Sequence, residues 1–291
     1  MNPRVPLYVV DAFAEVPFAG NPAAVCFPPP DAPAPWMQSV AGEMNLSETA
    51  FVVPREDGSW GLRWFTPARE VDLCGHATMG AAHVLWETGR LDATRPALFR
   101  TRGGDLTCER GDEGVIRMDF PARPATACEV PGGLAEALGA DIRWCGRSVD
   151  DLMVELPHAS VVRQIAPDMA RIAGFPARGV IVTAASDEPG PDFVSRFFAP
   201  AVGVPEDPVT GSAHCTLGPF WAARLGRSRL RGWQASRRGG WVDVECHGDR
   251  VMLGGRAVTV LAGEWMGGAS GAIPGRDRKS TRLNSSHANI S

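Results

Sequence analysis

The sequence predicts an α+β protein built from two similar halves, in each of which a sheet wraps around one central helix. A duplication is the main observation. The segment 63–67 leads through an acidic stretch to Gly-His-Ala at 75–77, and the segment 196–200 leads through another to Gly-Ser-Ala at 211–213. Each copy continues into an apolar run that a glycine ends. Because a helix that is apolar almost all round has to be enclosed, each half needs a sheet around its helix.

The composition is that of a globular chain of ordinary charge. Its 291 residues, 44% hydrophobic and 21% charged, suffice for two domains with their own cores. A formal net charge of −4 gives no reason to expect a nucleic acid or a membrane as a partner. The seven cysteines include no Cys-x-x-Cys pair, and the N-terminus lacks the pattern of a signal peptide. We therefore expect a cytoplasmic protein with reduced thiols.

In the first half, alternating and apolar runs predict strands and two longer segments predict helices. The strands are expected at 7–13, 23–27, 48–54, 61–65, 97–101, 106–109 and 115–120, and the helices at 35–44 and 76–88. Gly89 is the expected C-cap of the second helix. A proline-rich stretch at 121–131 marks the expected boundary between an N-terminal domain, 1–125, and a C-terminal domain, 126–256.

The second half repeats this plan. Strands are expected at 142–145, 152–156, 161–165, 179–184, 193–198, 241–246, 250–253 and 257–261, and helices at 132–139, 167–173 and 211–225. Pro219 lacks an N–H and is expected to bend or split the last helix. Arg224, Arg227, Arg229 and Arg231 are interpreted as a solvated basic patch at its end, or alternatively as a contact for an acidic substrate tail.

Residues 277–291 are set apart from the fold. The stretch from Asp277 to His287 is what one reading frame of a common sequencing adapter encodes, and the whole segment is polar and aperiodic. We interpret it as an artefact tail without ordered structure rather than as a natural disordered end, and we leave it out of the reasoning on fold and function.

Several separated motifs share their order and spacing with a known family. They are Asp11-Ala12-Phe13, the run from Pro17 to Val25, the run from Asn45 to Phe51, Phe65-Thr66-Pro67, the run from Asp72 to Thr78, and the run from Glu206 to Ala213. In this order they resemble the family named for the phenazine-biosynthesis isomerase PhzF, which has the diaminopimelate-epimerase-like fold. The resemblance extends from about residue 6 to residue 263.

The resemblance implies two pseudo-symmetric domains, each a curved antiparallel sheet around a central helix, with a cofactor-free active site between them. It also implies that residues 257–275 return to the first domain and that the protein forms a homodimer. In the family's isomerase a glutamate carries a proton between two carbons of a cyclic acid. That glutamate corresponds to Glu48, and its supporting positions correspond to Gly75, His76, Asp207, Gly211 and Ser212.

Glu48 is the candidate general acid and base. It lies at the entrance to an apolar strand, where partial burial is expected to raise the pKa of its carboxyl and let it take and return a carbon-bound proton. The alternative for any single glutamate is a solvated residue at the end of a strand. The surrounding motif favours the catalytic role.

The two helix starts are the candidate anion-binding elements. Gly75 and Gly211 allow close approach of a ligand to the backbone. The neighbouring N–H groups, with the His76 imidazole and the Ser212 hydroxyl, can hold a carboxylate or a developing enolate. The alternative is helix capping, which suits serine well and histidine poorly.

Two further polar residues have less specific interpretations. Asp207 is expected to orient His76 across the cleft or to act as a second acid, and it is also compatible with a turn before Pro208. Asn21 either lines the pocket or builds its Gly-Asn-Pro turn.

Cys74 raises the alternative of a racemase that uses two facing thiols. The counterpart of Cys74 in the second copy is Thr210, whose hydroxyl is too weak an acid, so this alternative is disfavoured and a buried structural thiol is expected. No metal is expected, because neither Cys74 and His76 nor His214 and Cys215 belong to a full ligand set by spacing. No cofactor is expected either, since nucleotide-binding glycine motifs are absent from the sequence.

The sequence thus predicts a cofactor-independent isomerase that moves a proton between carbons of a small unsaturated or cyclic carboxylic acid through Glu48. A catalytically idle protein that binds a small metabolite in the same cleft is the alternative from another functional class.

Overall fold

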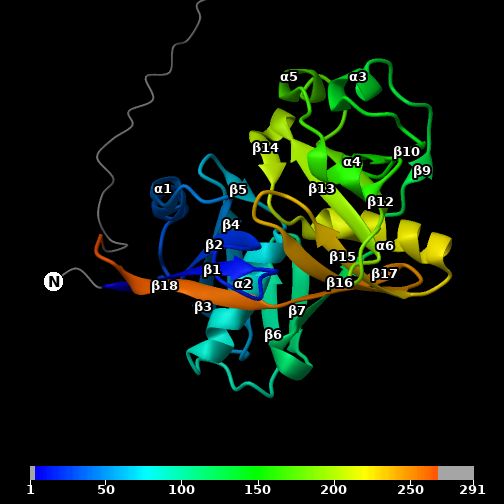
Figure 1. Cartoon of the computed structure of the whole chain (residues 1–291). Coiled ribbons are helices and arrows are strands. Elements are labelled where there is room, and N and C mark those ends of the chain that lie inside the picture. The colour runs from blue at the N-terminus through cyan, green and yellow to red at the C-terminus, as the bar shows by residue number, and fades with distance from the viewer. Residues whose placement is uncertain (1–3, 268–291) are drawn as a thin grey trace, which may run out of the picture.

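The computed structural model describes residues 4–267 and consists of two lobes, each with a helix inside (Figure 1). The expected artefact tail, 277–291, and the last part of the 257–275 segment lie outside the described residues. The first lobe contains β1 (Val5–Ala12), β2 (Asn21–Cys26), α1 (Ala34–Met44), β3 (Glu48–Pro54), β4 (Trp60–Phe65), β5 (Glu70–Val71), α2 (Gly75–Glu87), β6 (Ala97–Thr101), β7 (Gly104–Arg110), the 3-10 turn η1 (Asp112–Gly114) and β8 (Ile116–Pro121).

The second lobe contains the same succession of elements with additional short helices. They are β9 (Thr126–Ala127), α3 (Leu134–Leu138), β10 (Trp144–Arg147), β11 (Leu152–Glu155), α4 (Ala159–Gln164), α5 (Met169–Ile172), β12 (Val180–Ala185), β13 (Phe193–Ala199), the 3-10 turn η2 (Pro200–Val202), β14 (Val204–Asp207), α6 (Gly211–Leu225), β15 (Arg229–Gln234), β16 (Gly240–His247) and β17 (Arg250–Gly255). The last strand, β18 (Ala257–Trp265), lies beside β1 of the first lobe. None of the helices in the part of the chain described here is long and apolar enough to cross a membrane.

The strands form one sheet that runs through both lobes. Its order is β18–β1–β2–β3–β4–β6–β7–β8–β17–β16–β15–β13–β12–β11–β10–β9, with β5 paired to β4 and β14 paired to β13. The pairing of β8 with β17 joins the lobes. The last strand, β18, pairs with β1 of the first lobe. The exact domain boundaries, including the extent to which residues 257–275 belong to the first domain, stay a prediction.

The two lobes share one topology, and the duplicated α+β fold is thereby confirmed. In each lobe a hairpin is followed by a strand that joins it in parallel, an antiparallel partner, a short edge strand, the central helix, and a further parallel strand. The sheet is therefore mixed, whereas the family resemblance implied a purely antiparallel sheet in each domain. The reason is that α1, α2, α4 with α5, and α6 are crossover connections, and a crossover returns the chain in parallel.

Both central helices are enclosed, as their apolar sequences predict, α2 over most of its length and α6 as far as Trp221. Nearly every residue of α2 is buried, and a Cβ built at Gly80 would already contact Val10 and Val25 at 3.5 Å. In α6, Gly218 leaves room for Val244, which would lie 2.7 Å from an added Cβ. Each large apolar side chain enclosed in this way stabilises the fold by about 1.5–3 kcal/mol.

Pro219 does not split α6, which runs unbroken from Gly211 to Leu225. The missing N–H of Pro219 leaves the carbonyl of Cys215, four residues earlier, without its helical donor. The backbone N–H of Arg123 fills that place at 2.9 Å. The proline thus provides the attachment point at which the segment between the lobes is fixed to the second helix.

Three expectations on secondary structure are wrong. The segment 161–165, expected as a strand, belongs largely to helix α4, because the parallel pairing of β11 with β12 needs a helical crossover and only Ala159 and Val162 of this helix are buried. The C-cap of α2 is Thr88, and Gly89 follows it with a φ of +68°. Strand β15 was not expected, because its arginines were assigned to a basic patch.

Candidate active site

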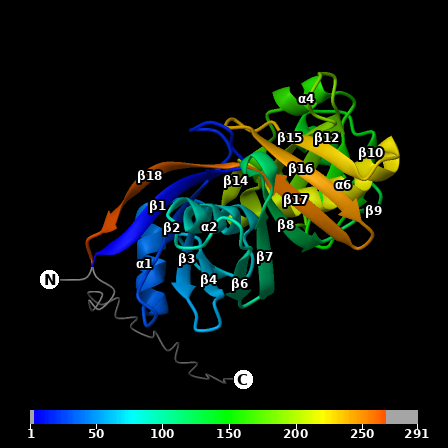
Figure 2. The ribbon, with the colours of Figure 1, turned by 90° about the horizontal axis from the view of Figure 1, so that it is seen from below.

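The two central helices point their N-termini at each other. A Cβ built at Gly75 would lie 4.0 Å from the Cα of Gly211, and one built at Gly211 would lie 4.0 Å from the Cα of Gly75. The first N–H groups of an α-helix have no partner within the helix and carry the positive end of its dipole. Two such ends at one place favour a bound anion. Figure 2 shows α2 and α6, each inside its own lobe.

Glu48 and His76 meet beside the tip of α2. Glu48 is the first residue of β3 and His76 is the second residue of α2, and Oε2 of Glu48 lies 3.2 Å from Nε2 of His76. Their side chains are 19% and 8% exposed, so this pair is largely removed from water. Glu48, predicted from its place at the start of a strand, and His76, predicted from its place at the start of a helix, are therefore neighbours in the structure.

The expected rise in the pKa of Glu48 is wrong. Burial raises the pKa of this carboxyl, but the hydrogen bond and the charge of His76, together with Cys74, bring it below its usual value of 4.5. Burial lowers the pKa of His76, while Cys74 and Glu48 raise it to well above 6.5. Because burial keeps Cys74 a neutral thiol with a pKa of about 11, Glu48 is the negative partner of His76 at neutral pH. The pair therefore consists of a carboxylate and an imidazolium.

Cys74 completes a cluster that spacing along the chain did not reveal. Its Sγ lies 3.6 Å from Nδ1 of His76, and one donor atom each of Glu48, Cys74 and His76 lie within 4.8 Å of one another. Thiolate, imidazole and carboxylate are all zinc ligands. Metal binding would require Cys74 and His76 to lose their protons, which the high pKa of each opposes at neutral pH. His214 and Cys215 form no such cluster within residues 4–267.

Asp207, the last residue of β14, lies in a hydrogen-bond network shortly before the start of α6. Its Oδ1 accepts from Nδ2 of Asn21 at 2.8 Å, and its Oδ2 accepts from Oγ1 of Thr210 at 2.5 Å. Burial raises the pKa of Asp207, and the charge of His76 opposes that rise. Asp207 is thus electrostatically coupled to His76, but its two oxygens are bound by Asn21 and Thr210 rather than by the imidazole.

Asn21 connects the two lobes. It is completely buried at the start of β2, and its Nδ2 also donates to the carbonyl of Val209, 2.9 Å away. The turn before it is held by Arg238, whose Nη2 pairs with the buried Asp11 at 2.7 Å. Asn21 therefore fixes the first lobe's turn against the entrance of α6.

Ser212 belongs to a different group of side chains. Its Oγ accepts a hydrogen bond from Nη2 of Arg178 at 3.1 Å, and Nε of Arg178 donates to Oδ1 of Asp151 at 2.9 Å. Within the described part of the chain Ser212 has no hydrogen bond to Glu48 or His76. Arg178 and Asp151 were not among the residues expected at the site.

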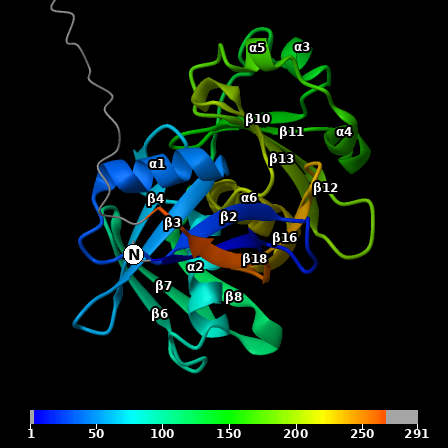
Figure 3. The ribbon, with the colours of Figure 1, turned by 90° about the vertical axis from the view of Figure 1, so that its left-hand side faces the viewer.

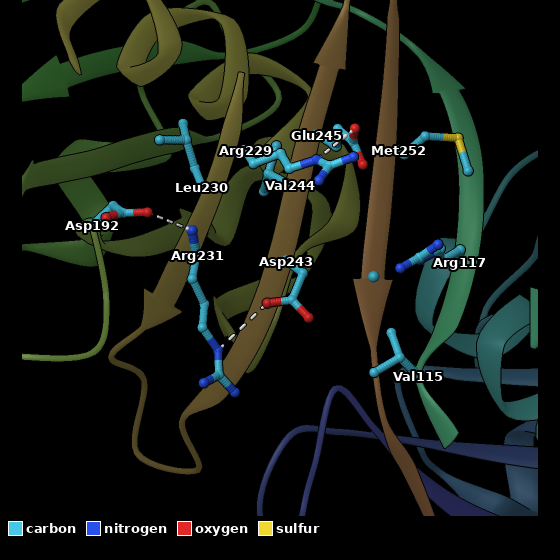
Figure 4. Close-up of a pocket in the computed structure, with 11 residues that line it drawn as sticks. Val115, Arg117, Asp192, Arg229, Leu230, Arg231, Asp243, Val244, Glu245 and Met252 are labelled. Carbon is cyan, nitrogen blue, oxygen red and sulfur yellow. Dashed lines mark hydrogen bonds and ion pairs between the residues drawn. The ribbon is translucent and has the colours of Figure 1, made fainter. Parts of the chain in front are cut away.

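The arginines interpreted as a basic patch are all neutralised. Arg224 pairs with Glu155, Arg227 with Asp192, Arg229 with Glu245, and Arg231 with Glu15 and Asp243. Arg229 and Arg231 line a hollow of about 410 Å³ on the outer face of β15, β16 and β17, where acidic and basic side chains alternate (Figure 4). This hollow shares no residue with the cluster around His76. The expectation of a basic patch is therefore wrong.

Relatives of the chain are named isomerases. A protein of Halalkalibacterium halodurans named as an uncharacterized isomerase is 47% identical over 260 residues, which cover 89% of this chain and 97% of the relative. One of Pseudomonas aeruginosa, also named as an uncharacterized isomerase, is 48% identical over 266 residues, which cover 88% of this chain and 97% of the relative. The protein described here is accordingly an isomerase.

The family follows from two further findings. The crystal structure of a phenazine biosynthesis protein of the PhzF family from Enterococcus faecalis matches with a TM-score of 0.86 and 40% identity, covering 90% of this chain and 99% of that chain. The model of the phenazine biosynthesis-like protein family, PhzC-PhzF, matches residues 10–263. The chain belongs to this family, and the resemblance identified from its motifs is confirmed.

Proposed function

We propose that the protein is a cofactor-independent isomerase in which Glu48 moves a proton between two carbons of a small unsaturated or cyclic carboxylic acid. The observation that carries this proposal is the 3.2 Å contact between Oε2 of Glu48 and Nε2 of His76 beside the meeting point of two helix N-termini. A base, a cation and unpaired N–H groups are thereby gathered where an anionic intermediate would form.

The reaction divides into two proton transfers. In the first, the Glu48 carboxylate takes a proton from carbon, so a C–H bond breaks, an O–H bond forms, and the electron pair is delocalised over the conjugated acid. The imidazolium of His76 and the N–H groups of α2 and α6 stabilise this charge. In the second, the carboxyl of Glu48 returns the proton to another carbon of the same conjugated system. No electron acceptor is needed.

Exchange with solvent separates this enzyme from a catalytically idle binding protein. The intact protein, incubated in deuterium oxide with a panel of unsaturated ring acids, should incorporate deuterium at carbon in at least one of them. The idle binder would hold an acid, as measured by calorimetry, without exchange.

A two-thiol racemase makes a different prediction for Cys74. The thiol of Cys74 is buried with a pKa of about 11, and its counterpart Thr210 donates its hydroxyl to Asp207. We expect Cys74→Ala to lower the exchange rate by no more than about tenfold, because the substitution removes packing and no acid or base. A loss beyond about a thousandfold, together with inactivation of the wild type by thiol reagents, would favour the racemase.

We also propose that the protein acts as a homodimer that pairs through β18. Among the described strands, β18 pairs only with β1 and so lies at the edge of the sheet (Figure 2). Its side chains Val260 and Leu261 are 37% and 50% exposed. An exposed apolar edge strand is a template for a second strand. Leu261→Lys should therefore weaken dimerisation at least tenfold in sedimentation equilibrium, whereas Leu98→Lys, an exposed residue on β6, should not. A wild type that remains monomeric at high concentration would contradict this proposal.

A further inference from the structure

We propose that Cys128 and Cys145 form a thiol–disulfide site. A small disulfide such as oxidised glutathione would convert the two thiols into a cross-link between β10 and the connecting segment, residues 122–133, which joins β8 of the first lobe to α3 of the second. Neither cysteine belongs to the cluster around His76, and the proposed isomerase reaction uses neither thiol.

The two cysteines are neighbours across an antiparallel strand pair. Ala127 on β9 pairs with Gly146 on β10, and Figure 1 shows the two strands side by side. The next step of this register places Cys128 opposite Cys145. The N–H of Cys128 donates to the carbonyl of Cys145 at 3.1 Å, which continues the ladder by one residue. Side chains of directly opposed residues lie on the same face of a sheet.

The separation of the two sulfur atoms suits a disulfide. They lie 3.7 Å apart, in contact but unbonded, and all seven cysteines are free thiols. A disulfide needs an S–S distance of about 2.0 Å and Cα atoms about 4.4–6.8 Å apart. Directly opposed residues of antiparallel strands have Cα atoms about 4.5–5.5 Å apart. Closing the bond therefore needs rotation of the side chains rather than movement of the strands.

The two thiols differ in their access to solvent. Cys128 is exposed, whereas Cys145 is only 4% exposed and belongs to the same buried core as Leu134 and Leu138 of α3. Burial, together with the contact with Cys128, raises the pKa of Cys145 to about 12. Because the thiolate is the nucleophile in disulfide exchange, a dissolved oxidant reacts with Cys128 first, and Cys145 reacts second from inside the lobe.

The reaction consists of two exchanges. The thiolate of Cys128 attacks one sulfur of oxidised glutathione, so an S–S bond forms to Cys128 and one glutathione thiolate leaves. Cys145 then loses its proton and attacks Sγ of Cys128, so the protein disulfide forms and the second glutathione thiolate leaves. Each departing thiolate takes up one of the two protons. Two protein thiols are oxidised to one disulfide, and one glutathione disulfide is reduced to two thiols.

The cross-link would fix the far end of the connecting segment. Its near end is already held, because the N–H of Arg123 donates to the carbonyl of Cys215 on α6 at 2.9 Å and its guanidinium pairs with Asp150. Beyond the two-residue strand β9, residues 128–130 are exposed. The disulfide would close the loop 128–145 around α3, and a closed loop restricts the unfolded chain and so stabilises the folded one.

Thiol counting on the full-length protein tests the pair. Reduced wild type would be incubated with oxidised glutathione at neutral pH, quenched with acid, alkylated and digested with trypsin for mass spectrometry. Two of the seven thiols should escape alkylation. Arg143 lies between the two cysteines, so trypsin separates Cys128 from Cys145 unless a disulfide joins their peptides. The oxidised protein should also unfold at a temperature at least about 3 °C higher than the reduced protein.

Single substitutions distinguish a pair from two independent thiols. Cys145→Ala should stop at the mixed disulfide of Cys128 with glutathione. Cys128→Ser, a change at an exposed position, should leave Cys145 a free thiol and should show no rise in unfolding temperature after the same treatment. Cys246→Ser, which removes a half-buried thiol of β16, is the matched control and should form the cross-link as the wild type does.

Four results would each overturn the inference. In the wild type they are two unreacted thiols, glutathione on Cys128 beside a free Cys145, and a cross-link that leaves the unfolding temperature unchanged. The fourth is loss of the cross-link in Cys246→Ser.

Discussion

Replacing Glu48 by glutamine is expected to reduce deuterium exchange into substrate by at least about a thousandfold while the fold is retained. General acid and base catalysis contributes about 10²–10⁴ to a rate, and the proposed reaction uses this one carboxyl for both transfers. Glutamine has the same shape and can still hydrogen-bond to His76, but it can neither take nor return a proton. The side chain is 19% exposed and lies at a strand end, so the substitution opens no cavity.

The measurement for Glu48 is exchange of carbon-bound hydrogen followed by nuclear magnetic resonance, with thermal unfolding of the same samples. Glu56→Gln is the matched control, because Glu56 is an exposed glutamate in the turn after the same strand. Wild-type exchange in Glu48→Gln would remove this residue from the mechanism. Loss of activity accompanied by unfolding would call for Glu48→Asp, which keeps the charge but shortens its reach.

Replacing His76 by asparagine is expected to lower exchange at neutral pH about a hundredfold and to move the acidic limb of the pH–rate profile to higher pH. Burial raises the pKa of Glu48, and the contacts with His76 outweigh that effect. Without the imidazolium, burial prevails, so the carboxylate form that accepts the proton is populated only at higher pH. The asparagine also lacks the positive charge that stabilises the intermediate.

The same pair predicts how the stabilising effect of His76 varies with pH. The folded-state pKa of Glu48 is lowered, so its contribution is present above about pH 4.5 and is lost as pH falls through that lowered value. The folded-state pKa of His76 is raised, so its contribution is complete below about pH 6.5 and is lost as pH rises through the raised value. Urea unfolding should therefore show the largest difference between wild type and His76→Asn between pH 4.5 and 6.5. A difference that grows from pH 6.5 to pH 9 would contradict the assigned ion pair.

Much of the architecture was predictable because it depends on local patterns. Apolar runs that end at Gly89 and Gly226 indicated two enclosed helices, and the repeated motifs around Phe65 and Phe198 indicated the duplication. Their order along the chain also identified the family. The parallel pairs were not predicted, for example that of β11 with β12 in the second lobe (Figure 3). Alternation along a strand does not reveal the direction of its neighbour.

The candidate site was predictable where motifs carried it and not where side chains from distant segments meet. Glu48 and His76 were singled out from their sequence surroundings. Arg178 was not, because the sequence around it has no motif and its relation to Ser212 depends on the register of β12 against β13. The four arginines between 224 and 231 were misread for the same reason: their acidic partners, such as Glu155 and Glu15, come from remote strands and turns.

By itself the sequence determined a duplicated α+β chain, its two buried helices and the residue types available at their starts. These properties follow from periodicity and from the conformations that glycine and proline allow, which act over a few residues. Only the tertiary structure decided that Glu48 is held as a carboxylate, that Cys74 adjoins it, and that Arg178 faces Ser212. The pKa of a buried group depends on desolvation and on charges within a few ångströms, and those neighbours are brought together by folding rather than by position along the chain.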